Sequence, residues 1–224
     1  MPDGCALPLR VFTPLDIDFS LAEGFKVTED FRGTVLFFHG GGWVNGDVDF
    51  YTDACSAMAL RLERRVVSVD YRLAPEHPYP AAVEDAMRAW DYLMYQGYGA
   101  RDVVVAGDSA GGNLALVLTH LLKEAGRRLH RALILFSPRK DMTASGKTYQ
   151  ERESIDPVLP TLIQAGTNEI LLSDSIRLRD RLIQAAVPCR LEVWTDLWHV
   201  FQMFPMKKAG EAMESVGRFL LETL

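Results

Sequence analysis

The stretch that decides the fold is Val103-Val104-Val105-Ala106-Gly107-Asp108-Ser109-Ala110-Gly111-Gly112-Asn113. Its small and β-branched apolar start predicts a short buried strand, and the breaker-free residues 113–122 predict a helix. Between them, Gly107-x-Ser109-x-Gly111 is the pattern of a sharp strand-to-helix turn that lifts a serine hydroxyl clear of the sheet. Glycine suits both flanking positions because strand and helix come too close there for a Cβ atom.

The same turn would place the positive end of the helix dipole beside the serine, where it stabilises developing negative charge. A five-residue pattern also arises by chance, as a glycine turn that merely contains a serine. The chemical assignment therefore depends on what the rest of the chain supplies.

Length and composition indicate one soluble globular domain spanning residues 1–224. Hydrophobic residues make up 48% of the sequence and charged residues 24%, which is ordinary for a chain that buries a core. The net charge of −6 is mild and gives no reason to expect nucleic acid or an anionic membrane as a partner.

Three cysteines, Cys5, Cys55 and Cys189, are an odd number, lie far apart and have no metal-ligand spacing. They predict reduced thiols rather than a disulfide or a zinc site, and hence a cytoplasmic protein. The first residues lack the pattern of a signal peptide, and no apolar run reaches the length of a membrane span.

Buried apolar strands alternate with helices along the chain. Strands are expected over residues 6–12, 33–38, 65–70, 103–106, 132–136, 161–165 and 190–194, and helices over 51–64, 81–95, 113–126, 173–186 and 206–221. Residues 16–30 suggest a hairpin or an antiparallel edge strand, residues 140–159 are irregular, and Ser173 is expected to cap its helix. The alternation predicts an α/β fold: a mostly parallel sheet of about eight strands, covered by helices on both faces.

A reactive serine needs a base, and His199 is the candidate. It lies in a predicted loop, residues 196–201, between the last strand and the last helix. In an open α/β sheet such loops converge on one crevice, toward which the serine of the turn also points. The other histidines lie within a helix, before a strand, among prolines or beside glycines whose loop they shape: His120, His130, His77 and His39.

The carboxylate that orients the base should follow a strand between Ser109 and His199. The strand over residues 161–165 leads into Gly166-Thr167-Asn168-Glu169, and Glu169 is the preferred acid. Asp174 is the alternative, although the dipole favours a carboxylate in the first turn of any helix. Asp196 precedes His199 on the same loop and is expected to face solvent.

Backbone N–H groups must also stabilise the oxyanion that forms when a serine attacks a carbonyl group. Ala110, directly after the serine, supplies one, and the glycines of His39-Gly40-Gly41-Gly42-Trp43 supply the others. Glycine allows the backbone to approach a substrate carbonyl closely. The loop lacks the Gly-Lys-Ser/Thr ending of a phosphate-binding loop and the glycine spacing of a dinucleotide site.

Together these motifs resemble the bacterial hormone-sensitive-lipase-like esterases of the α/β-hydrolase superfamily. The matching segments are His39–Trp43 with Gly46, residues 70–81 (Asp-Tyr-Arg-Leu-Ala-Pro-Glu-His-Pro-Tyr-Pro-Ala), 107–112, 137–138, 169–174 and 198–202. The resemblance implies Ser109 as nucleophile, His199 as base and Glu169 as acid, at a position where the family more often has aspartate. It implies an oxyanion hole formed by Gly41, Gly42 and Ala110.

The same resemblance implies hydrolysis of short-chain acyl esters, with a small-molecule ester as the partner and with neither metal nor cofactor. Family members usually carry a helical segment before the first strand and a longer passage after Ser137-Pro138. Both are short here, so a reduced or absent cap is expected. An uncovered apolar cleft would favour self-association, and a homodimer is therefore a further hypothesis.

Two other functions are compatible with the sequence. A deacetylase of acetylated sugars or small amides needs the same catalytic groups and differs only in its pocket. A ligand-binding protein on a hydrolase fold usually loses the nucleophile or the base, whereas this chain keeps serine, histidine and a carboxylate.

Overall fold

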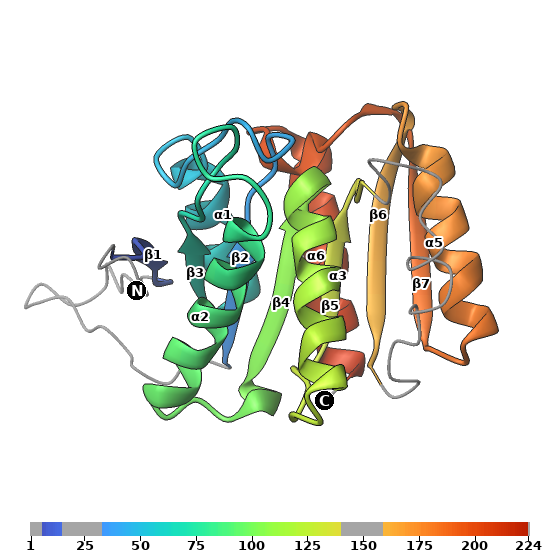
Figure 1. Ribbon diagram of the computed structural model, residues 1–224. Helices are drawn as coiled ribbons and strands as arrows, with labels where there is room; N and C mark the ends of the chain where they lie inside the picture. Colours follow the sequence, from blue (N-terminus) through green and yellow to red (C-terminus); the bar gives the residue numbers. More distant parts are fainter. Residues whose placement is uncertain (1–5, 15–32, 140–158, 224) are drawn as a thin grey trace, which may run out of the picture.

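The computed structural model describes residues 6–14, 33–139 and 159–223, and its centre is a seven-stranded sheet. The strands lie in the order β1-β3-β2-β4-β5-β6-β7 (Figure 1). Neighbouring strands are parallel except β1 and β3, which are antiparallel. The strands are β1 Leu9–Phe12, β2 Thr34–Phe38, β3 Arg65–Val69, β4 Val103–Asp108, β5 Leu133–Phe136, β6 Thr161–Asn168 and β7 Cys189–Trp198.

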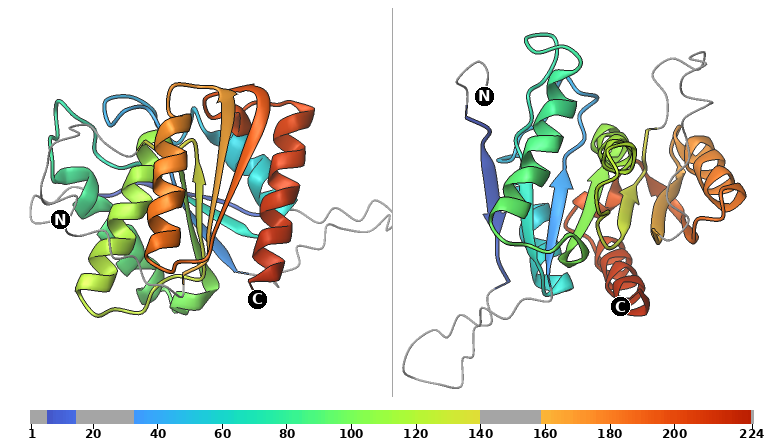
Figure 2. Two further views of the ribbon diagram at one scale, coloured as in Figure 1. Left: turned by 90° about the vertical axis from the view of Figure 1, so that its right-hand side faces the viewer. Right: turned by 60° about the horizontal axis from the view of Figure 1, so that its bottom comes forward.

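Helices cover both faces of this sheet. They are α1 Thr52–Leu62, α2 Ala81–Tyr95, α3 Ser109–Glu124, α5 Leu172–Gln184 and α6 Lys207–Glu222, with 3₁₀ turns at Ala100–Asp102 and Phe201–Met203. Helices α2, α3 and α5 lie on one face, and α1 and α6 lie on the other (Figure 2). The three-layer α/β sandwich predicted from the sequence is confirmed.

The apolar strand sequences explain this arrangement. Val103 and Val105 of β4 belong to the core under α2, α3 and α5, whereas Val104 and Ala106 belong to the core under α1 and α6. Every residue of β2, β4 and β5 is buried. A strand buried on both faces must be apolar at successive positions, which is why these strands appear in the sequence as continuous runs.

The register of the sheet brings the strand ends together at one edge. Phe38, the last residue of β2, pairs with Gly107, and Asp108, the last residue of β4, pairs with Phe136. The residues that follow the strands β2, β4, β5, β6 and β7 are His39, Ser109, Ser137, Glu169 and His199. The sheet therefore places the candidate nucleophile, acid and base at the same edge, the upper one in Figure 1.

Two strands are longer than the sequence pattern predicts. β6 continues to Asn168 and β7 to Trp198, so the segment expected to be a loop from Asp196 begins as strand. The two strands stay paired through an irregularity between Gly166 and Asn168. Gly166 allows this because a Cβ atom there would overlap the carbonyl oxygen of Leu197. Pairing between the strands outweighs the turn-forming composition of Gly166-Thr167-Asn168.

The expected helix cap at Ser173 is wrong. Helix α5 begins at Leu172, and the residue in the capping position is Leu171, two residues before Ser173. Ser173 therefore lies inside the first turn, where its hydroxyl accepts a hydrogen bond from Arg177 (3.3 Å). The described residues supply seven of the roughly eight strands expected, since residues 16–30 lie outside the described ranges. Most of the segments on which the expectation of a reduced cap rests also lie outside them.

Across the described ranges, no helix combines the length and the apolar composition needed to cross a bilayer.

Candidate active site

Ser109 stands at the turn between β4 and α3 in a strained conformation. Its φ angle is +49°, in the left-handed region that non-glycine residues rarely adopt. The turn is possible because Gly107 and Gly111 have no side chains. A Cβ atom on Gly111 would overlap the carbonyl oxygens of Phe38 and His39, and one on Gly107 would overlap the carbonyl oxygen of Gly111. The hydroxyl is consequently presented at the N-terminus of α3.

His199 lies within hydrogen-bond distance of Ser109. The distance from its Nε2 to Ser109 Oγ is 3.0 Å, although the two residues are 90 positions apart in the chain. His199 directly follows β7, and the next residue, Val200, also has a positive φ angle of +52°. The imidazole is 36% exposed and therefore open to an approaching substrate.

Glu169 lies on the other side of His199, with its carboxylate completely buried. Its Oε2 accepts hydrogen bonds from Ser137 Oγ (2.6 Å) and from the Gly166 N–H (3.0 Å). Its Oε1 is 4.0 Å from His199 Nδ1, which is beyond hydrogen-bond distance. Neither of these two buried atoms has a hydrogen-bond partner among the described residues. Hydrogen bonds of this kind are often long without substrate and shorten in the reacting complex.

The surroundings of Glu169 keep it ionised. Burial alone would raise the pKa of Glu169, but its hydrogen bonds and the nearby imidazole lower it below its ordinary value. A buried carboxylate that remains negative beside Nδ1 can stabilise a positively charged imidazole.

The two alternative carboxylates have other surroundings. Asp174 lies in the first turn of α5 and forms an ion pair with Arg177 at 2.7 Å. Asp196 is exposed, and its backbone N–H donates to Thr167 Oγ1 (2.8 Å).

The other four histidines have different surroundings. His39 and His130 are fully buried, and burial lowers the pKa of both, that of His130 to about 4. His120 pairs with Glu124 one turn later on α3, and His77 is exposed. All five histidines lie within the described ranges, and among them only His199 forms a hydrogen bond with the Ser109 hydroxyl.

The glycine loop after β2 lies beside this group. Gly41 has a φ angle of +111°, and its carbonyl oxygen accepts from the N–H groups of Val44 (3.3 Å) and Asn45 (3.0 Å), which closes a tight turn. The Gly40 N–H donates to Asp108 Oδ1 (2.8 Å). That amide is therefore occupied by a side chain of the protein.

Asp108 and Tyr51 hold the first residue of this loop, Gly40, in place. The sequence analysis missed this role. The Tyr51 hydroxyl donates to Asp108 Oδ2 (2.8 Å) and can accept from the Gly40 N–H (3.1 Å). Burial raises the pKa of Asp108 to about 7, against the opposing effect of these hydrogen bonds. The position of Asp108 at the end of a strand is a signal that could have been used, whereas nothing in the local sequence marks Tyr51.

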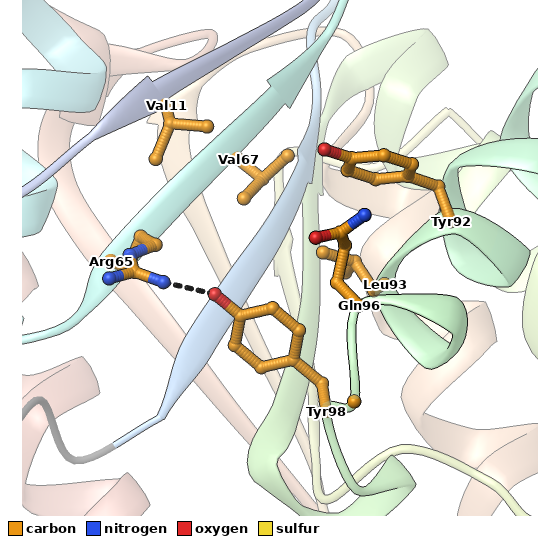
Figure 3. A pocket seen from close by; sticks show the side chains of 8 residues that line it. Val11, Arg65, Val67, Tyr92, Leu93, Gln96 and Tyr98 are labelled. Carbon is orange, nitrogen blue, oxygen red and sulfur yellow. Dashed lines mark hydrogen bonds between the residues drawn. The ribbon is translucent and has the colours of Figure 1, made fainter.

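A separate cavity of about 440 Å³ lies away from these residues (Figure 3). In it the Arg65 guanidinium donates to the Tyr98 hydroxyl. Arg65 is the first residue of β3, so the cavity lies at the opposite strand ends from Ser109. Its lining residues are Val11, Arg65, Val67, Tyr92, Leu93, Gln96, Gly97 and Tyr98.

Comparison with known proteins relates this geometry to a family. Residues 35–160 match a family described as having the alpha/beta hydrolase fold. An esterase of Acinetobacter venetianus is 31% identical, with 95% of this chain and 82% of that protein covered by the alignment. An acetyl-hydrolase of Streptomyces hygroscopicus is 30% identical, with 89% of this chain and 79% of that protein covered.

Solved structures give the same relationship. The crystal structure of an esterase from the bacterial hormone-sensitive lipase family superposes with a TM-score of 0.78 at 31% sequence identity. The superposition covers 87% of this chain and 77% of that protein.

Proposed function

The chain belongs to the α/β-hydrolase family, among the carboxylesterases related to bacterial hormone-sensitive lipase, and we propose that Ser109, His199 and Glu169 are its catalytic triad. The observation that carries this proposal is the 3.0 Å distance between Ser109 Oγ and His199 Nε2. A serine hydroxyl at this distance from a histidine nitrogen can transfer its proton as it attacks.

In the first half of the reaction, His199 Nε2 takes the proton of Ser109 while Oγ attacks the carbonyl carbon of the ester. The resulting oxyanion accepts hydrogen bonds from the N–H groups of Gly41, Gly42 and Ala110. Collapse of the tetrahedral intermediate breaks the bond to the alkoxy oxygen. His199 delivers its proton to that oxygen, the alcohol leaves, and the acyl group remains on Ser109.

In the second half, water repeats the attack on the acyl carbon. His199 takes a proton from this water and returns it to Ser109 Oγ as the carboxylic acid departs. Glu169 holds the imidazole with Nδ1 protonated and stabilises its positive form in both halves. Its lowered pKa keeps it negative at the pH where a neutral histidine can act as a base.

We propose short-chain acyl esters of small alcohols as the substrates. The motifs of the glycine loop and the serine turn support this class through their resemblance to the family. Acetyl esters, including those of acetylated sugars, are the second candidate, because one relative with nearly full-length similarity is named an acetyl-hydrolase. A series of p-nitrophenyl esters from acetate to octanoate would distinguish an acetyl-specific pocket from a more general one.

The assignment is tested by replacing the nucleophile. We expect Ser109→Ala to lower kcat for p-nitrophenyl butyrate by roughly 10³-fold or more, because no other group supplies the attacking oxygen. A fluorophosphonate should label the wild-type protein at Ser109 and leave the variant unlabelled. Near-wild-type turnover by the variant would show that Ser109 is not the nucleophile.

A further inference from the structure

Ser137 is a buried serine with hydrogen bonds to two segments of the site. It directly follows β5, has a φ angle of +45° and is 0% exposed. Its Oγ donates to Glu169 Oε2 (2.6 Å) and accepts from the backbone N–H of Val200 (3.2 Å). One hydroxyl therefore links the carboxylate of Glu169 to the residue after His199.

The position of Ser137 is itself fixed by the sheet. Its backbone N–H donates to the carbonyl oxygen of Gln164 in β6 (2.7 Å). Two residues later, the Arg139 N–H donates to the carbonyl oxygen of Ser109 (3.0 Å). Residues 137–139 consequently contact the segments that carry the nucleophile, the acid and the base.

The hydroxyl also limits how the Glu169 side chain can rotate. A glutamate side chain has three rotatable bonds, and a carboxylate held by a single donor can turn about its last bond. Ser137 and the Gly166 N–H together occupy Oε2, which leaves Oε1 directed at His199 Nδ1. Without the Ser137 hydroxyl, the Val200 N–H next to His199 would also lose its acceptor.

We propose that Ser137 is a positioning residue for the ester-hydrolysis reaction, which holds Glu169 and the His199 segment in the orientation that lets His199 face Ser109. This inference rests on the proposed triad. Ser137 acts through Glu169 and His199, and none of its recorded contacts involves the nucleophile's hydroxyl.

The first test compares Ser137→Ala with a matched serine elsewhere. Ser215 Oγ donates to Glu192 Oε1 at the same distance of 2.6 Å, but on α6 and β7 and outside the triad. We expect Ser137→Ala to lower kcat by roughly 10- to 100-fold with KM changed less than about twofold, because misplacement of catalytic groups slows the chemical step. Ser215→Ala should keep kcat within about twofold of wild type while losing a comparable hydrogen bond.

A double-mutant cycle separates positioning from general destabilisation. If Ser137 acts through Glu169, Ser137→Ala should cost little further activity in a Glu169→Gln background. Additive losses in the cycle, or a wild-type kcat in Ser137→Ala, would overturn the inference. Should Ser137→Ala fail to fold, Ser137→Gly provides the same test, since glycine accepts the positive φ angle and also lacks the hydroxyl.

The proposed triad is tested separately from the role of Ser137. Ser109→Ala activity and fluorophosphonate labelling of the wild type test the proposed function alone. An inactive Ser109→Ala together with a fully active Ser137→Ala would leave the triad standing and reject only the role of Ser137.

Discussion

Glu169 and Asp174 lie close together in the chain, yet their carboxylates meet different partners. Glu169 is buried and faces His199 Nδ1, whereas Asp174 forms an ion pair with Arg177 on its own helix. Glu169 directly follows β6, whereas Asp174 lies in the first turn of α5. Two carboxylates that are equivalent as chemical groups therefore have different capacities to orient a base.

Replacing each acid in turn tests this difference. We expect Glu169→Ala to lower kcat by roughly 10³-fold or more, because the imidazole loses both its orientation and the negative charge that stabilises its protonated form. Asp174→Ala should retain activity within about threefold of wild type, since it removes one ion pair at the start of a helix. Steady-state kinetics with p-nitrophenyl acetate would measure both, and the opposite ranking would assign the acid to Asp174.

At the level of single residues, the sequence indicates candidate site residues that follow strands. It misses residues whose role depends on contacts with another segment of the chain. Ser109 and His199 could be identified because parallel strands end at one edge, where the structure brings them within 3.0 Å. Tyr51 could not be identified in this way, and Ser137 follows β5 although its position alone does not indicate its partners. Their roles depend on contacts with Asp108 and Glu169, which are remote in the chain and are set by the packing of whole elements.

Among the elements, the turn from β4 into α3 leaves no room for a side chain at Gly107 or Gly111. Gly111, in the first turn of α3, lies against the backbone of Phe38 and His39 at the end of β2. Gly217 in α6 is a contrasting helical glycine, because the nearest atom to a Cβ there would be Leu62 Cδ2 at 3.8 Å. The same residue type thus serves a close approach in one helix and has room to spare in another.

Alanine at these two glycines should have opposite effects on stability. We expect Gly111→Ala to lower the free energy of unfolding by about 2 kcal/mol or more, because a Cβ atom there must displace the backbone of a central strand. Gly217→Ala should raise it by up to about 1 kcal/mol, as expected for a helix interior. Urea denaturation followed by circular dichroism would measure both. A neutral Gly111→Ala would show that α3 and β2 can separate without cost.

The elements themselves differ in how well the sequence predicts them. The helix over residues 81–95 and the strands buried on both faces were predictable, because periodicity and continuous apolar runs record the faces that are covered. The ends of β6 and β7 were not. Their pairing beyond Ala165 depends on a neighbour in space, and the local composition there favours a turn.

For the molecule as a whole, the unfolding equilibrium is linked to one buried carboxyl group. Burial raises the pKa of Asp108 to about 7 in the folded chain, whereas an exposed aspartate titrates near 3.8. Between these pH values the folded chain holds a proton that the unfolded chain has released. The stability contributed by this proton is fully present below the unfolded pKa and is lost as the pH rises through about 7.

Asp108→Asn should therefore alter how stability depends on pH. Each unit of pKa difference corresponds to about 1.4 kcal/mol, so the wild type should lose stability relative to the variant between pH 5 and pH 8. We expect the Tm of the variant minus that of the wild type to be higher at pH 8 by roughly 3 °C or more. Differential scanning calorimetry at the two pH values would measure this, and an unchanged difference would mean that Asp108 titrates in the folded chain as it does in the unfolded one.

The division of the proposed triad among strand ends has a consequence for how activity emerges during folding. Ser109 follows the strand at the centre of the sheet, whereas Glu169 and His199 follow the last two strands at one side. A chain that had assembled β2 and β4 but had not yet added β6 and β7 would carry the proposed nucleophile without the proposed base. Forms that lack β6 and β7 would therefore be inactive. The recovery of esterase activity after dilution from denaturant would report completion of the sheet rather than formation of its centre.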